Sequence, residues 1–169
     1  MKPLLISLFL LLPCSQVFAG PSLETVLGML RRGTIASNQG DIPTLLKTLP
    51  AKGASITHPT GETVTVDRKM METYLSGYFK SMKPGSYLYG AKLCAVDAKD
   101  ANTITVTLEI SESYLLIEKD APTSSCYREK LTVGLENDQP VVLKAVMEKT
   151  EAKRIEAAEA LPAGAKAKE

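Results

Sequence analysis

The sequence has few of the residues from which catalytic and metal centres are usually built. Its 169 residues include no tryptophan, three phenylalanines, three cysteines and one histidine, His58. A site made of several histidines is therefore excluded, and a mixed cysteine and histidine zinc site is disfavoured. The sequence also lacks a glycine-rich phosphate loop and a Gly-x-Ser-x-Gly nucleophile motif. We expect neither a metal nor a cofactor.

Neither sign of charge is in excess. The chain has 20 lysines and arginines against 19 aspartates and glutamates. A nucleic-acid-binding protein carries a clear basic excess, and a protein that binds anionic lipid carries a polybasic patch. The balance of charges disfavours both classes, and we expect no nucleic acid partner.

Long hydrophobic runs are also absent. The apolar run at residues 4–12 follows Lys2 and is too short to cross a bilayer. Such a run before a small residue such as Ala19 is typical of a signal peptide, so we predict that residues 1–19 are cleaved after Ala19. The mature chain would then be secreted or periplasmic, without a membrane span. An uncleaved anchor is the alternative; lipidation of Cys14 is disfavoured by the proline before it.

The clearest β-strand pattern in the chain lies at residues 103–117. Apolar residues occupy alternate positions, and mainly polar residues lie between them. Successive side chains of a strand point to opposite faces, so this pattern predicts a strand with one buried and one solvated face. The alternating apolar residues are Ile104, Val106, Leu108 and Ile110.

Three helices are predicted before this strand, each with a capping residue at its start. Ser22, Asp41 and Asp67 are residue types that accept hydrogen bonds from the first backbone amides of a helix. Gly40 and the Pro84–Gly85 pair are stop signals. The first helix has an apolar stripe of Leu23, Val26, Leu27 and Leu30, and the third has one of Met71, Tyr74, Leu75, Tyr78, Phe79 and Met82.

The remaining segments are predicted to form strands. A small hairpin is expected around a Pro/Gly turn, and long strands follow the third helix with short connections, which favours an antiparallel meander. Leu131, Val133 and Leu135 keep one parity, and so do Val141, Leu143, Ala145 and Met147. The predicted strands are 54–58 and 62–66 in the hairpin, then 86–96, 103–117, 126–135 and 141–147.

These elements predict one α+β domain at residues 20–150. Three N-terminal helices and the small hairpin would pack on a bent, four-to-six-stranded antiparallel sheet. The rest of the chain, residues 151–169, is rich in alanine, lysine and glutamate and is expected to be partly helical or disordered.

The order of elements resembles the nuclear transport factor 2-like superfamily, which includes SnoaL-like cyclases and ketosteroid isomerases. The resemblance covers residues 23–149. It is carried by the apolar start of the first helix, the Gly40–Asp41 break, the turn after His58, the helix after Asp67 and the strands that follow. It is a resemblance of element order and apolar pattern, and it therefore bears on fold more than on function.

The resemblance implies a cone whose pocket lies between the helices and the long strands. The pocket candidates are Tyr74, Tyr78, Tyr87, Tyr89 and His58. The alternative is that these tyrosines are ordinary core or rim residues. The resemblance also implies a convex sheet face on which members of the superfamily commonly dimerise.

The residues of the isomerase site are not found. The end of the first helix carries no tyrosine, and no aspartate lies within an apolar strand. His58 adjoins Pro59 in a turn, where we expect it to be exposed. Glu109, Glu112 and Glu118 are interpreted as residues on the solvent face of the central strand. No catalytic residue is assigned.

The two cysteines that follow the signal peptide form a candidate disulfide. Cys94 is expected opposite Val106 and Cys126 opposite Ile117, which places them beyond the reach of a disulfide in a plain meander. An oxidising compartment nevertheless favours pairing. Both possibilities remain open.

Three functions remain open as well. The preferred hypothesis is a non-enzymatic binding or accessory module that holds a small apolar ligand in the cone or a protein partner on the sheet. The second is a SnoaL-like enzyme in which a tyrosine or His58 lies beside a carboxylate. The third is a subunit of a cell-envelope assembly, which would expose an apolar patch.

Overall fold

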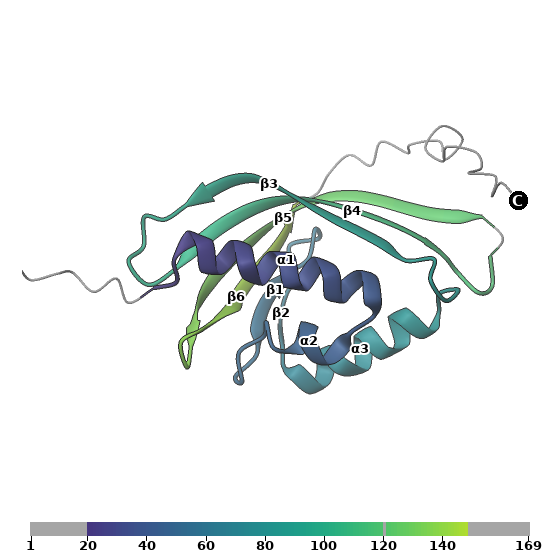
Figure 1. Ribbon diagram of the computed structural model, residues 1–169, viewed down its shortest axis with the longest axis horizontal. Coiled ribbons are helices and arrows are strands. Elements are labelled where there is room, and N and C mark those ends of the chain that lie inside the picture. Colours follow the sequence, from purple (N-terminus) through teal and green to yellow (C-terminus); the bar gives the residue numbers. More distant parts are fainter. Residues whose placement is uncertain (1–19, 120, 149–169) are drawn as a thin grey trace, which may run out of the picture.

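The computed structural model describes residues 20–119 and 121–148 (Figure 1). The predicted signal peptide and tail lie outside these ranges. None of the described helices is long and apolar enough to cross a membrane. The elements are α1 (Leu23–Gln39), α2 (Ile42–Leu46), β1 (Ala54–Thr57), β2 (Thr63–Val66), α3 (Arg68–Lys80), β3 (Leu88–Asp97), β4 (Ile104–Leu115), β5 (Pro122–Glu136) and β6 (Gln139–Glu148).

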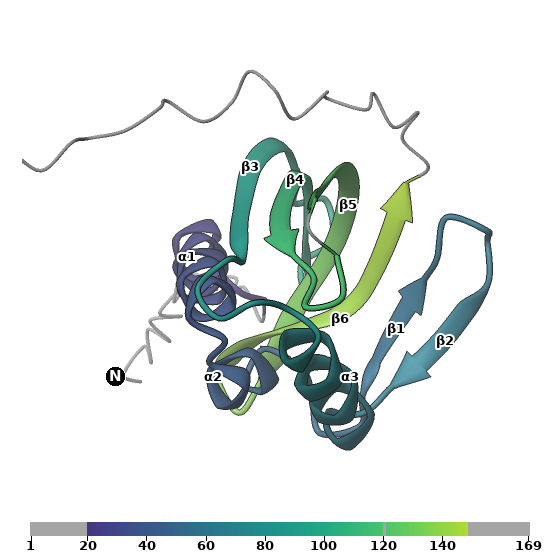
Figure 2. The ribbon, with the colours of Figure 1, turned by 90° about the vertical axis from the view of Figure 1, so that its right-hand side faces the viewer.

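The strands form one six-stranded sheet in the order β2-β1-β6-β5-β4-β3. Three of its neighbouring pairs, β3–β4, β4–β5 and β5–β6, form the predicted antiparallel meander. The prediction of a wholly antiparallel sheet is wrong, because β1 pairs with β6 in parallel. The small hairpin thereby extends the sheet, which bends around the helices (Figure 2).

The three predicted caps are confirmed. The side chains of Ser22, Asp41 and Asp67 accept hydrogen bonds from backbone amides three residues further on. Gly40 ends α1 in the left-handed conformation, with φ of 64°. Only glycine adopts this conformation without steric cost, so the sequence marks the turn into α2.

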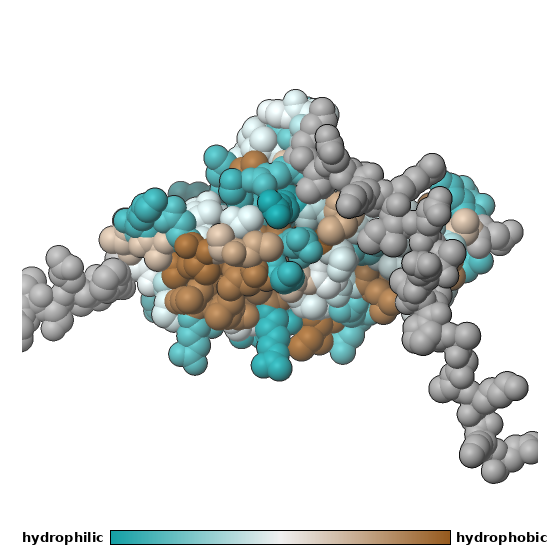
Figure 3. Space-filling model, turned by 90° about the horizontal axis from the view of Figure 1, so that it is seen from above, coloured by the Kyte–Doolittle hydropathy of each residue, from teal (hydrophilic) through white to brown (hydrophobic). Residues whose placement is uncertain are grey.

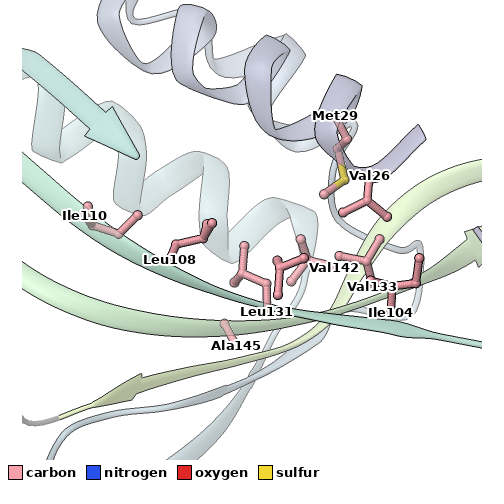
Figure 4. Close-up of a cluster of buried hydrophobic side chains, with 10 residues drawn as sticks. Val26, Met29, Ile104, Leu108, Ile110, Leu131, Val133, Val142 and Ala145 are labelled. Carbon is pink, nitrogen blue, oxygen red and sulfur yellow. The ribbon is translucent and has the colours of Figure 1, made fainter. Parts of the chain in front are cut away.

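The main core lies between α1 and the middle of the sheet (Figure 4). β4 presents the four alternating apolar residues predicted from its sequence, and all are buried. α1 contributes Val26 and Met29, whereas Leu23 and Leu27 stay about 40% exposed. The side of α1 that faces the sheet is therefore the side of Val26 and Met29, and not that of Leu23 and Leu27 as the predicted stripe implied.

α1 and β3, which contact each other, both carry exposed apolar side chains. Leu23 and Leu27 on α1 and Leu93 and Val96 on β3 are each about 40% exposed. Figure 3 shows apolar surface gathered toward the end of the molecule where α1 begins. The edge strand β3 is therefore only partly covered by the helix.

A bulge changes the predicted parity of β6. The register with β5 shifts between Thr132 and Val133, which face Lys144 and Val142. Leu143 is the extra residue, and its side chain is 39% exposed while Val141 and Val142 are buried. The prediction that Ala145 shares a face with Val141 and Leu143 is therefore wrong, because the inserted residue reverses the alternation and places Ala145 in the core cluster with Val142.

The cysteines do not form a disulfide in the structure, and both are exposed. Cys94 lies at a bulge in β3 beside Leu108 and Thr107 of β4. Cys126 lies opposite Ser111, so the predicted register opposite Ile117 is wrong. β5 begins at Pro122, earlier than predicted. The two cysteines lie on opposite sides of β4, separated by two strand spacings of roughly 10 Å across the sheet and by three to four residues, about 12 Å, along it.

Candidate functional site

A cluster of tyrosines lies where α3 meets the concave face of the sheet. The rings of Tyr74 and Tyr78 stack along α3 with centroids 5.9 Å apart. Tyr78 then meets Tyr87 and Tyr114 edge-on, at 5.9 and 5.7 Å. Edge-to-face packing of this kind stabilises aromatic pairs beyond the area that they bury. α3 has no fully buried side chain, and the ring of Tyr78 joins it to Tyr114 of β4.

The strands contribute residues from the same parity that fills the core. Tyr89 of β3 lies opposite Glu112 of β4, and Tyr127 of β5 lies opposite the buried Ile110. Glu129 faces the buried Leu108. The same face of these strands is therefore apolar in the core and polar at this end of the sheet, where it presents tyrosine hydroxyls and two carboxylates.

Glu112 is the hydrogen-bonding centre of this end of the sheet. Its Oε1 accepts hydrogen bonds from the hydroxyls of Tyr87 at 2.9 Å and Tyr127 at 3.5 Å. Its Oε2 accepts one from the hydroxyl of Ser125 at 3.2 Å. The interpretation of Glu112 as a solvent-face residue is wrong: its position has the parity of Ile110, whereas Glu109 has the opposite parity.

Glu129 lies half-buried near Glu112 and makes no hydrogen bond or ion pair within the described ranges. Burial and the negative charge of Glu112 raise the pKa of Glu129 to about 7. Burial also raises the pKa of Tyr87 and Tyr127, and the charge of Glu112 adds to it. A carboxyl group with a pKa near neutrality, beside hydrogen-bonding hydroxyls, can exchange a proton with a bound molecule.

Among the described residues, no ion pair joins a cation to either carboxylate. The ion pairs among the described residues involve Glu136, Asp97 and Glu148, and neither Glu112 nor Glu129 takes part. The same part of the chain contains no group of histidines, cysteines and carboxylates that could hold a metal. The cluster therefore presents acceptors and aromatic rings to any molecule that approaches it.

We compared the sequence and the fold with known proteins. No protein-family model and no curated protein matches the sequence. A type 2 hexachlorocyclohexane dehydrochlorinase has a TM-score of 0.66 at 8% identity, over 83% of this chain and 93% of that one. A ketosteroid isomerase-like protein from Erwinia carotovora atroseptica has a TM-score of 0.60 at 12% identity, over 75% and 95%.

An NTF2-like protein from Cytophaga hutchinsonii has a TM-score of 0.56 at 15% identity, over 77% of this chain and 99% of that one. The chain has the nuclear transport factor 2-like fold. At such identities the likeness concerns the fold alone, so function must be argued from the residues of this chain.

The structure brings together four of the five pocket candidates of this nuclear transport factor 2-like cone. Tyr78, Tyr87 and Tyr89 are partly buried in the cluster, and Tyr74 lies at its rim, 64% exposed. His58 is exposed in the turn between β1 and β2, and no hydrogen bond or ion pair of its side chain is found among the described residues. His58 is not part of the cluster.

The sequence interpretation missed Glu112, Tyr114, Tyr127 and Glu129. Glu112 continues the alternation that identified β4, because it follows Ile110 by two residues. Tyr127 and Glu129 likewise precede Leu131 at intervals of two. Their parity was available in the sequence, but the predicted register set Cys126 opposite Ile117 instead of Ser111, so Tyr127 and Glu129 were not placed beside Ile110 and Leu108.

Asn38 at the end of α1 fixes the position of the edge strand. Its amide nitrogen donates to the carbonyl of Tyr89 at 3.0 Å, and its oxygen accepts from the Tyr89 backbone amide at 2.7 Å. A cleft of about 350 Å³ lies beside this contact, and Asn38, Phe79 and Tyr87 are among its lining residues. Asn38 thus positions the strand that carries Tyr89, and Tyr87 lies directly before the start of this strand.

Proposed function

We propose that this protein binds a small ligand on the concave face around Glu112 and Glu129. The observation that carries the proposal is the uncompensated pair of carboxylates, set among tyrosine rings at the end of the apolar concave face. The ligand would place an apolar or aromatic body against the rings and a hydrogen-bond donor or positive charge on the carboxylates. The role is that of a binding module, as the sequence suggested.

Ligand-observed NMR with a fragment library tests this proposal. The library should contain aromatic amines, aromatic alcohols and aromatic carboxylates of matched size. We expect the amines and alcohols to show saturation transfer, and Glu112→Gln with Glu129→Gln to weaken their binding at least tenfold. Glu109→Gln, which removes one carboxylate from the opposite face of β4, is the control. Equal binding of the carboxylates would contradict the proposal.

A second candidate function is enzymatic proton transfer. A pKa of about 7 suits Glu129 to act as a general base or acid at neutral pH, and the Tyr87 hydroxyl beside Glu112 could orient a polar substrate group. Incubation with aromatic ketones in D₂O, followed by NMR, tests this function. Deuterium entering the α-carbon, and lost in Glu129→Gln, would support an enzyme; binding without exchange would support the binding module.

We also propose that the chain is secreted or periplasmic and forms a homodimer through the convex face of the sheet. The apolar run at residues 4–12 before Ala19 supports the first proposal, and the polar, solvated face of β4 supports the second. Mass spectrometry of the protein recovered from its host would test both. We expect the chain to begin at residue 20 and the intact assembly to have the mass of two such chains. A full-length monomer would contradict both proposals.

A further inference from the structure

A second cleft, of about 450 Å³, lies away from the tyrosine cluster. α1, α2, the first residue of α3 and the turn between β5 and β6 enclose it. Figure 1 shows this turn at the opposite end of the molecule from the connection between β4 and β5, near which the tyrosine cluster lies. Its volume is in the range of sites that bind small molecules.

One wall of the cleft is held rigid by a network around Arg68. Its Nε and Nη2 donate to the carbonyl of Leu49 at 2.9 and 2.6 Å. Glu136 accepts the backbone amide of Ala51 with both carboxylate oxygens and lies 3.5 Å from Arg68 Nη2. The Arg68 guanidinium is thus oriented by fixed partners, while its Nη1 makes no hydrogen bond among the described residues.

Two further cations line the same cleft. Arg32 of α1 and Lys47, the residue directly after α2, form no ion pair within residues 20–119 and 121–148. Asp41 is close enough to Lys47 for their charges to interact, but its carboxylate accepts the amide of Thr44 and does not line the cleft. The cleft therefore contains three cationic groups and one carboxylate, Glu136, whose oxygens are already occupied.

The remaining lining suits an organic ligand better than a bare ion. Met29, Pro140 and Val141 supply apolar surface, while Thr44 and Asn137 add polar groups. Gly33 opens the α1 side, because a side chain at this position would meet nothing within 4 Å. A molecule with an apolar body and one anionic group would contact both kinds of surface.

We propose that this cleft binds a small organic anion, which carries a carboxylate or a phosphate group. Arg68 offers a fixed guanidinium, and Arg32 and Lys47 close on the anion from α1 and the end of α2. The Nη1 of Arg68 is the nitrogen that can donate to an anion, whereas the Arg32 guanidinium can pair with a carboxylate or phosphate through two parallel hydrogen bonds. The site shares no residue with the concave face around Glu112. Anion binding in this cleft therefore does not depend on the ligand binding proposed for Glu112 and Glu129.

Calorimetric titration of the full chain tests the proposal with benzoate, phenyl phosphate, inorganic phosphate and benzylamine. We expect at least one of the two aromatic anions to bind more tightly than inorganic phosphate, and the stronger one identifies the anionic group. Arg32→Gln with Lys47→Gln should weaken its binding at least tenfold. Arg31→Gln, the control for Arg32→Gln on the same helix, removes one positive charge outside the cleft and should change the affinity less than twofold.

Three results would overturn the proposal. The first is that neither aromatic anion binds the wild-type chain, and the second is that benzylamine binds as tightly as the anions. The third is that Arg31→Gln weakens binding as much as Arg32→Gln, which would indicate nonspecific attraction to a basic surface. Circular dichroism establishes that each variant is folded. Glu112→Gln should leave anion binding unchanged, which distinguishes this site from the concave face.

Discussion

At the residue scale, Glu129 lies in an environment that disfavours its negative charge. Burial is the main cause of its raised pKa, and the charge of Glu112 adds to it. The folded state therefore holds a proton on Glu129 at pH values where the unfolded chain has lost it. Between about pH 4.5 and 7 the folded state binds more protons, so the free energy of unfolding falls as the pH rises through this window.

Replacing Glu129 by glutamine should reduce this pH dependence. We expect the wild-type melting temperature to fall between pH 5 and pH 8, and that of Glu129→Gln to fall less, because glutamine cannot ionise. Differential scanning calorimetry across the range measures both. Glu109→Gln, on the opposite face, should keep the wild-type slope. Parallel slopes for wild type and Glu129→Gln would contradict the raised pKa.

The Tyr87 hydroxyl should contribute measurably to stability. Tyr87→Phe keeps the ring contacts with Phe79 and Tyr89 but removes the donor to Glu112. We expect a loss of about 1–2 kcal/mol in the free energy of unfolding, because the acceptor is a partly buried carboxylate. Urea denaturation measures it. Tyr89→Phe is the control, since no hydrogen bond of its hydroxyl is found in the described ranges; equal losses would contradict the assignment.

At the element scale, the end of α1 and the strand β3 act as one unit. β3 is an edge strand, and the Asn38 side chain supplies the donor and acceptor that a neighbouring strand would otherwise provide. An edge strand without such a partner exposes unpaired backbone groups. The position of Tyr87 and Tyr89 relative to α3 therefore depends on a residue outside the sheet.

Asn38→Ala should destabilise the protein and loosen β3. The variant loses two hydrogen bonds to Tyr89, each worth about 0.5–1.5 kcal/mol. We expect a total loss of about 1–3 kcal/mol and faster hydrogen exchange of the Tyr89 amide. Gln39→Ala, at the exposed neighbouring position, should change neither. Unaltered exchange at Tyr89 in Asn38→Ala would exclude the proposed contact.

The elements themselves could be predicted from the sequence because their signals are local. The caps at Ser22, Asp41 and Asp67, the left-handed Gly40 and the alternation of β4 each depend on residues within one turn or one strand. The bulge at Leu143 could not be predicted, since it depends on how β6 pairs with β5. The same is true of the parallel pairing of β1 with β6, which joins segments far apart in the chain.

At the scale of the whole molecule, the concave face of the bent sheet has one part that is covered by a helix and one part that is not. α1 covers the apolar middle of the concave face, and the tyrosines from α3, β3, β4 and β5 surround its polar end. Sequence reasoning placed four of these tyrosines in one cluster. It missed the carboxylates, because hydrophobic alternation identifies the buried face but does not show that a glutamate continues it.

The central claim is that the concave face around Glu112 and Glu129 holds a small ligand. Native mass spectrometry of the protein purified from its own host tests this claim most directly. We predict a non-protein mass that leaves on gentle activation, is retained in Glu109→Gln and is lost in Glu112→Gln with Glu129→Gln. A mass that persists in the double variant would place the ligand elsewhere, and an empty wild-type protein would contradict the claim.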